Sequence, residues 1–205
     1  MSIIKLNNNG VKNATAFGSG VTSLGSMVFI KKLTASGSST LSFVDGSGGV
    51  DFSTYKEYVF TFKDIHPATD GVFFQFNGSL DSGSNYNVVK TSTQFGAIHS
   101  EGGSGELGRT GYGLAQSSGF QGLTNGEDLG ADNDQSFTGS LNIFNPNSNT
   151  FVKHFISTTQ YSHLANYSAN IYTAGYFNTT SAVDAVRFEM SSGTFDGDIC
   201  LYGIA

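Results

Sequence analysis

Acidic side chains gather once in this sequence, between positions 127 and 134. Glu127, Asp128, Asp132 and Asp134 lie close together in a stretch rich in glycine. Calcium binds several carboxylates together with backbone carbonyls at short spacing, so these four residues form a weak candidate calcium site. The stretch lacks the Asp-x-Asp-x-Asp-Gly loop with its distal Glu, and a solvated acidic loop is the favoured interpretation. We therefore expect no cofactor, with calcium as the one candidate.

Tyrosine and histidine side chains mark a candidate recognition surface at Tyr112, Tyr161, His163 and Tyr167. The chain has no Trp, the usual stacking platform for sugars, but it has 9 Tyr. We expect residues 161–167 to join two strands, so that these rings project from loops. Tyr in loops is also common at protein contact surfaces, so a sugar and a protein partner both remain open.

Motifs for catalysis are absent from the sequence. There is no Gly-x-Ser-x-Gly, His-Glu-x-x-His or Walker motif. Residues 103–108 match Gly-x-Gly-x-x-Gly literally, but no βαβ pattern surrounds them, so a glycine-rich loop is predicted. The four histidines have no metal-ligand spacing, and His154 is expected to be a packed or hydrogen-bonded strand residue. The sequence predicts no enzymatic activity.

The composition favours a protein of short strands with an uncharged surface. Charged residues make up 13% of the 205 residues, against about 25% in ordinary proteins. The net charge of −6 argues against nucleic acid as a partner. The N-terminus lacks the pattern of a signal peptide, and no apolar run approaches the ~18 residues of a membrane helix. We expect synthesis in a cytoplasm and no membrane insertion.

Alternating apolar residues predict the strands that would position these side chains. One side of the predicted strand carries Tyr58, Phe60 and Phe62, and the other carries Glu57, Thr61 and Lys63, as in a half-buried strand. Asn77-Gly78 indicates a turn, and residues 100–135 indicate a long irregular surface loop. The pattern predicts an all-β fold, a jelly-roll-like antiparallel β-sandwich of about ten strands. Residues 1–25 are expected to form an N-terminal arm or first short strand, and residues 26–205 a single β-sandwich domain.

Three stretches in this order resemble tailed-bacteriophage virion proteins of the tail, fibre-tip or head-decoration type. They comprise residues 54–67 with 76–86, residues 139–154, and residues 174–204. The resemblance implies a jelly-roll-like sandwich without catalytic activity, used in virion architecture or host attachment and often oligomeric. It contributes no catalytic residues. Since no shaft or tail-anchoring domain precedes residue 26, a small decoration or capping subunit is expected rather than a long fibre.

Two functions from different classes follow. The first is a bacteriophage virion structural protein, a capsid decoration or tail-associated adhesin. It would contact other virion proteins, form a homotrimer and bind a host-surface glycan as a candidate ligand. The alternative is a soluble carbohydrate-binding module that uses the candidate recognition surface for stacking.

Overall fold

A computed structural model describes residues 27–110, 112–124, 126 and 129–205, so the predicted N-terminal arm lies outside the described residues. No helix in these ranges is long and apolar enough to span a membrane. The strands are, in chain order, β1 (Met27–Ser38), β2 (Thr40–Val44), β3 (Glu57–Pro67), β4 (Phe74–Ser79), β5 (Lys90–Ser100), β6 (Gly105–Thr110), β7 (Gln121–Gly122), β8 (Phe137–Phe144), β9 (Lys153–His163), β10 (Tyr167–Phe177), β11 (Ala185–Met190) and β12 (Phe195–Ile204).

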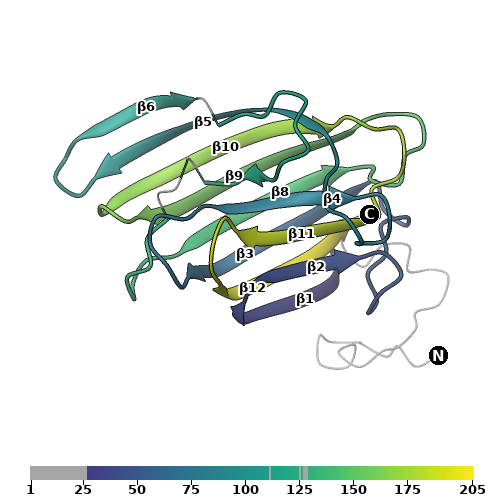
Figure 1. The fold of residues 1–205 in the computed structure, drawn as a ribbon, viewed down its shortest axis with the longest axis horizontal. Coiled ribbons are helices and arrows are strands. Elements are labelled where there is room, and N and C mark those ends of the chain that lie inside the picture. The colour runs from purple at the N-terminus through teal and green to yellow at the C-terminus, as the bar shows by residue number, and fades with distance from the viewer. Residues whose placement is uncertain (1–26, 111, 125, 127–128) are drawn as a thin grey trace, which may run out of the picture.

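The strands form two antiparallel sheets packed as a sandwich (Figure 1). The large sheet has the order β1-β12-β3-β8-β9-β10-β5-β6, and the small sheet has the order β2-β11-β4-β7. The first four strands alternate between the two sheets, and near the end of the chain β11 returns to the small sheet and β12 to the large one. This wrapping is the jelly-roll pattern. The predicted jelly-roll-like β-sandwich is confirmed.

Phenylalanine rings fill the space between the two sheets. Phe74 of β4 is fully buried. Its ring centroid lies 5.1–6.0 Å from four other rings, those of Phe62 in β3, Phe137 in β8, Phe188 in β11 and Phe195 in β12. These rings arise from the period-two alternation of each strand, which places every second side chain on the inner face. One apolar cluster thus joins both sheets.

The large sheet extends beyond the small one, so the inner faces of β5, β9 and β10 need another cover. Residues 112–124 supply it, with polar contacts beside the buried Leu123. Gln94 of β5 donates from Nε2 to Gly122 O at 3.0 Å, and Thr159 of β9 donates from Oγ1 to Leu123 O at 2.7 Å. The prediction of an irregular surface loop over residues 100–135 is therefore wrong in part. Leu123 and Leu129 are fully buried there, since the segment closes the core.

A fully buried lysine lies under this segment. Lys90 Nζ donates to Asn77 Oδ1 at 2.7 Å, to Val88 O at 3.0 Å and to Gly119 O at 2.6 Å. Burial lowers the pKa of this ammonium from 10.5 to about 7. Asn77 is itself fully buried inside β4, so the turn predicted at Asn77-Gly78 is wrong. Its amide instead donates to Tyr86 O at 2.8 Å and to Ser118 O at 2.9 Å, joining β4 to two loops.

Candidate recognition site

The predicted recognition residues divide among three places. Tyr161 is fully buried, so its assignment to the recognition surface is wrong. The reason is that β9 continues to His163, and its alternation carries Lys153, Phe155 and Tyr161 to the inner face. The strand predicted from the sequence was too short, so the prediction placed Tyr161 in the loop that follows it.

His163 and Tyr167 do come together, as the predicted connection between two strands implies. β9 ends at His163 and β10 begins at Tyr167, where the two residues pair in register. Their rings stack with centroids 5.0 Å apart and planes inclined by 29°. Ala165 N donates to His163 Nδ1 at 2.9 Å, and Asn166 takes the positive φ of 59° that the tight turn requires. The hairpin end therefore holds a fixed aromatic pair.

Beside Tyr167 lies a polar cavity of about 330 Å³, here called the hairpin pocket. Its lining comes from the ends of β5, β9 and β10 and from the segment before β8, and every residue in it is polar or aromatic. The carboxylates, amides and rings of this lining belong to Glu101, Asp134, Gln135, Gln160, Asn166, His99 and Tyr167. No Lys or Arg is among the described residues that line it. The pocket thus offers hydroxyl, amide and carboxylate groups and the imidazole of His99, without Lys or Arg.

Gln135 forms a fixed floor for this pocket. Its side chain is 4% exposed. Nε2 donates to His163 O and to Asn166 Oδ1, both at 3.3 Å, while Oε1 accepts from Asp132 N at 3.3 Å. Because one buried amide connects the β9–β10 hairpin with the segment before β8, the two walls are held at a constant spacing.

Two carboxyl groups, those of Glu101 and Asp134, lie at the exposed side of the hairpin pocket. Asp134 belongs to the predicted calcium site, as does the exposed Asp132. The other two members, Glu127 and Asp128, lie outside the described residues. Among the residues that are described, no group of three or more His, Cys, Asp or Glu side chains is arranged to hold a metal ion.

Tyr112 occupies a different hollow. It is 46% exposed and lines a cavity of about 550 Å³ together with Phe73, Leu114 and Phe120, beside the edge strand β7. This hollow and the hairpin pocket share no lining residue. The recognition surface predicted as one unit is therefore two separate hollows, one mainly apolar and one polar.

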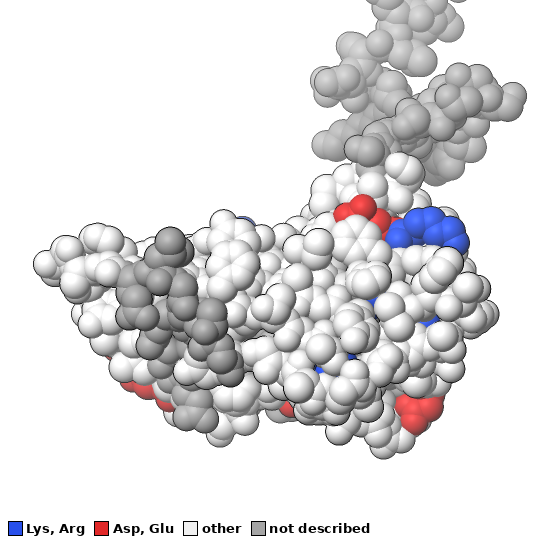
Figure 2. All heavy atoms as spheres, turned by 90° about the horizontal axis from the view of Figure 1, so that it is seen from above, with Lys and Arg blue, Asp and Glu red and all other residues white. Residues whose placement is uncertain are grey.

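One further candidate contact surface was not predicted from the sequence. The outward side chains of the neighbouring strands β5, β9 and β10 include no Lys, Arg, Asp or Glu, and we call this area the uncharged sheet face. Away from the hairpin pocket it consists of Thr93, Phe95, Ala97, His154, Ile156, Thr158, Asn170, Tyr172 and Ala174. In the view of Figure 2, most of the described surface belongs to residues other than Lys, Arg, Asp and Glu. The signal present in the sequence is the lack of Lys, Arg, Asp and Glu at the outward positions of three strands that become neighbours only in the fold.

Aromatic and aliphatic groups stand exposed on the uncharged sheet face. Phe95 is 48% exposed, Tyr172 is 42% exposed and Ile156 is 52% exposed. The rings of Phe95 and Tyr172 stack at 5.1 Å with planes 11° apart. His154 is exposed as well, its ring 6.0 Å from that of Tyr176, so it is not enclosed in the core as a packed strand residue would be.

The fold and these surfaces define a jelly-roll-like β-sandwich with one polar pocket at a hairpin end and an uncharged face on its large sheet. Comparison with protein-family models, with curated proteins and with solved structures finds no match to this chain.

Proposed function

We propose that this chain is a non-enzymatic structural protein of a tailed-bacteriophage virion, a capsid decoration or tail-associated adhesin. It would make assembly contacts with other virion proteins and recognise the host surface. The phage assignment rests on the resemblance of three ordered stretches to virion proteins. The observation that supports an assembly role is the uncharged sheet face.

The uncharged sheet face has the composition of a protein contact. The cores of such interfaces are depleted in charge and enriched in aromatic residues. Phe95, Ile156 and Tyr172 are each about half exposed, although strand alternation could have placed polar side chains there. Contiguous apolar patches of this kind on a protein surface mark interaction sites. We infer that this face packs against another chain, and that a homotrimer is the assembled form.

The assembly proposal is tested by light scattering on the purified chain and by mass spectrometry of purified particles. The double variant Ile156→Lys/Tyr172→Lys adds two charges to the uncharged sheet face and is expected to shift the trimer to monomer. Phe151→Lys is the matched control, since Phe151 is 68% exposed but lies between β8 and β9, outside that face. A variant that assembles like the native chain, or particles without the protein, would contradict the proposal.

Catalysis is not part of the proposed function. Glycosidases use two carboxyl groups, of which the acid is kept protonated by an apolar surrounding. Glu101 and Asp134 line one pocket, but both are exposed to solvent. An assay of polysaccharide hydrolysis is expected to give no product above background, and turnover that is lost in Glu101→Gln would overturn this part.

Carbohydrate binding is the second candidate function, and the hairpin pocket favours it. The pocket combines an aromatic ring with amides and carboxylates, the groups that can hydrogen-bond sugar hydroxyls. A glycan array separates the two candidates, because an assembly protein without a sugar site gives no signal. The two functions are compatible in a virion adhesin.

A further inference from the structure

The hairpin pocket has the chemistry to select one kind of ligand, and we infer that it binds a neutral sugar unit of a surface glycan. This inference rests on the host-recognition part of the proposed function and names the substrate class. It is carried by three features of the pocket, namely its charge, its hydrogen-bonding groups and its fixed walls.

Charge excludes anionic ligands. Glu101 and Asp134 both line the pocket, and no Lys or Arg is among the described residues that do so. A phosphate, sulfate or sialic acid carboxylate would meet these two like charges and neither Lys nor Arg, while the exposed imidazole of His99, which also lines the pocket, contacts Ser100 O through Nδ1 at 3.0 Å. Hydroxyl groups, in contrast, donate well to carboxylates, and such charge-assisted hydrogen bonds are stronger than neutral ones.

The remaining lining suits a polyol. Gln160 and Asn166 carry amides that both donate and accept, which matches hydroxyl groups that do the same. The half-buried ring of Tyr167 supplies an apolar surface against which the C–H groups of a sugar ring can pack. The cavity volume of about 330 Å³ lies at the lower end of the range for small-molecule sites, which suits one or two sugar units.

The pocket is also pre-formed. The stack of His163 on Tyr167 fixes the ring, and the buried Gln135 amide joins the walls. A site whose side chains are already ordered loses little conformational entropy on binding. The Tyr167 ring and the Gln135 floor are thus fixed before binding, whereas the exposed Glu101 and Asp134 side chains are ordered when the ligand binds.

The test is a glycan array with neutral, sialylated and phosphorylated glycans, followed by calorimetric titration with the neutral monosaccharides glucose, galactose, mannose and N-acetylglucosamine. We expect binding of neutral glycans, with a Kd on the order of 1 mM for a single unit. The double variant Glu101→Gln/Asp134→Asn is expected to weaken it about tenfold or more. Asp132→Asn is the matched control, since Asp132 is exposed nearby but does not line the pocket.

Several outcomes would overturn the inference. They are no neutral glycan above background, a preference for anionic glycans, and an affinity that the double variant leaves unchanged. The titration is repeated with EDTA, and binding lost with EDTA would show calcium-mediated recognition instead of direct hydrogen bonds to the carboxylates. Failure here remains distinguishable from failure of the structural role. A chain that binds no sugar but assembles and is present in particles contradicts only the sugar site.

Discussion

The interior of this protein has two regions that are closed in different ways. Between the two sheets, β3, β4, β8, β11 and β12 contribute phenylalanine rings that pack on one another. Beyond the small sheet, residues 112–124 cover β5, β9 and β10, and buried amides, hydroxyls and an ammonium lie there beside apolar side chains such as Leu123 and Ile171. We call them the ring region and the polar region.

The two regions differ in how strictly their contacts depend on the geometry of the partner groups. Apolar packing is non-directional and depends on the area removed from water, so the ring region tolerates many partners for each side chain. A buried polar group stabilises the fold only where a partner with suitable geometry meets it. The polar region satisfies this demand through long-range pairs, such as Lys90 with Gly119 and Thr159 with Leu123. Variants in each region, together with one at an exposed ion pair, test this difference.

Phe74→Ala should give the largest loss of stability. The substitution opens a cavity among four rings on four strands, and core Phe→Ala changes lower the free energy of unfolding by about 3–5 kcal/mol. In a chain of this size the melting temperature should fall by about 10 °C. Phe151→Ala is the control, because Phe151 is 68% exposed, and its effect should stay within about 0.5 kcal/mol. Denaturant titration measures both, and a loss below ~1 kcal/mol for Phe74→Ala would show that the ring region is not the centre of stability.

Lys90→Met should change how stability depends on pH. Burial lowers the pKa of Lys90 in the folded chain to about 7, while the unfolded chain keeps the ordinary value of 10.5. Between these values the unfolded state binds more protons, so the stability of the native chain rises with pH. The contribution from Lys90 should be about 2 kcal/mol between pH 7 and pH 9, and it should be missing in Lys90→Met.

This pH effect is measured as the difference between the native chain and the variant, so that groups common to both cancel. Unfolding is followed in urea at several pH values from 6.5 to about 9.5. Equal slopes in both chains would mean that Lys90 keeps an ordinary pKa in the fold, and that water reaches the polar region.

The sequence predicted the ring region far better than the polar region. Alternation along the sequence predicts the strand that contains Tyr58, Phe60 and Phe62, and all three side chains are buried as expected. Lys90 and Gln94 also point inward, but a polar residue at an inward position cannot be recognised from local alternation. Its burial depends on partners far along the chain, and Lys90 reaches Gly119 across 29 positions.

The candidate site was predicted in the same uneven manner. His163 and Tyr167 were placed together because a connection between two strands brings its ends close. Tyr161 was misplaced because the end of β9 was put too early, and a shift of a few residues decides whether a side chain is inside or outside. Glu101 and Gln135 were not foreseen as neighbours of Tyr167. They come from separate connections, and only the sheet order unites them.

Gln94→Met tests whether every polar group of the polar region is needed. Gln94 is 3% exposed, and its Oε1 is a buried atom for which no hydrogen-bond partner is found among the described residues. The bond from its Nε2 to Gly122 O is duplicated by Gln121 Nε2 at 2.9 Å, and only the bond from Nε2 to Thr173 Oγ1, at 2.9 Å, is lost without replacement. Removing an unsatisfied acceptor offsets the lost bonds, so the free energy of unfolding should change by less than about 1 kcal/mol.

Gln121→Met is the matched control for Gln94→Met. Gln121 is fully buried, and its side-chain amide both accepts a hydrogen bond from Ser92 Oγ and donates to Gly122 O. Its loss leaves the Ser92 hydroxyl without that acceptor. We therefore expect Gln121→Met to lower the free energy of unfolding by about 1–3 kcal/mol. Thermal or urea unfolding of both variants decides the matter. If Gln94→Met lowers the free energy of unfolding more than Gln121→Met does, then a water or another group donates a hydrogen bond to Gln94 Oε1 in the native chain.

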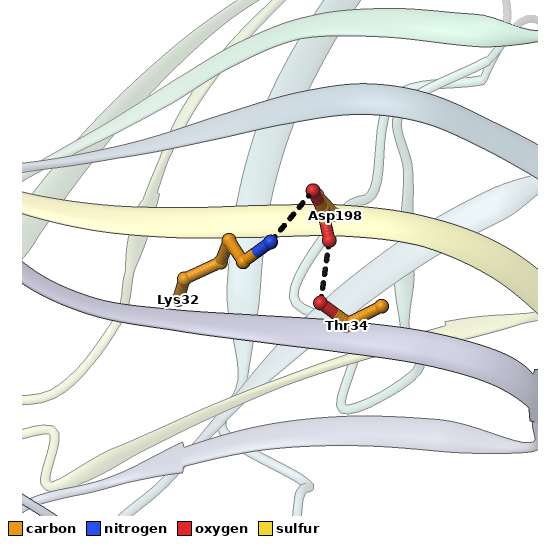
Figure 3. Close-up of polar contacts among 3 residues, drawn as sticks. All are labelled: Lys32, Thr34 and Asp198. Atoms are coloured by element: carbon orange, nitrogen blue, oxygen red, sulfur yellow. Dashed lines mark hydrogen bonds and ion pairs between the residues drawn. The ribbon is translucent and has the colours of Figure 1, made fainter.

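Asp198→Asn should have the smallest effect, and it sets an exposed charge against the buried one at Lys90. On the outer side of β12, Asp198 accepts from Lys32 Nζ at 3.0 Å and from Thr34 Oγ1 at 2.6 Å (Figure 3). The hydrogen bond from Thr34, and then that from Lys32, lower the pKa of Asp198 below its usual 3.8. The stabilisation is therefore present above pH 3.8 and is lost as the pH falls through the lower folded pKa.

Exposure to solvent limits how much the Lys32–Asp198 ion pair stabilises the fold. Lys32 is 50% exposed, so water competes with the ion pair and salt screens it. At pH 7 the melting temperature of Asp198→Asn should lie within about 2 °C of the native value. Adding 0.5 M salt should remove what difference there is, whereas the pH slope due to the buried Lys90 should persist in the same salt. A fall of more than ~5 °C would mean that the β1 edge depends on this pair, and that burial alone does not separate strong polar contacts from weak ones here.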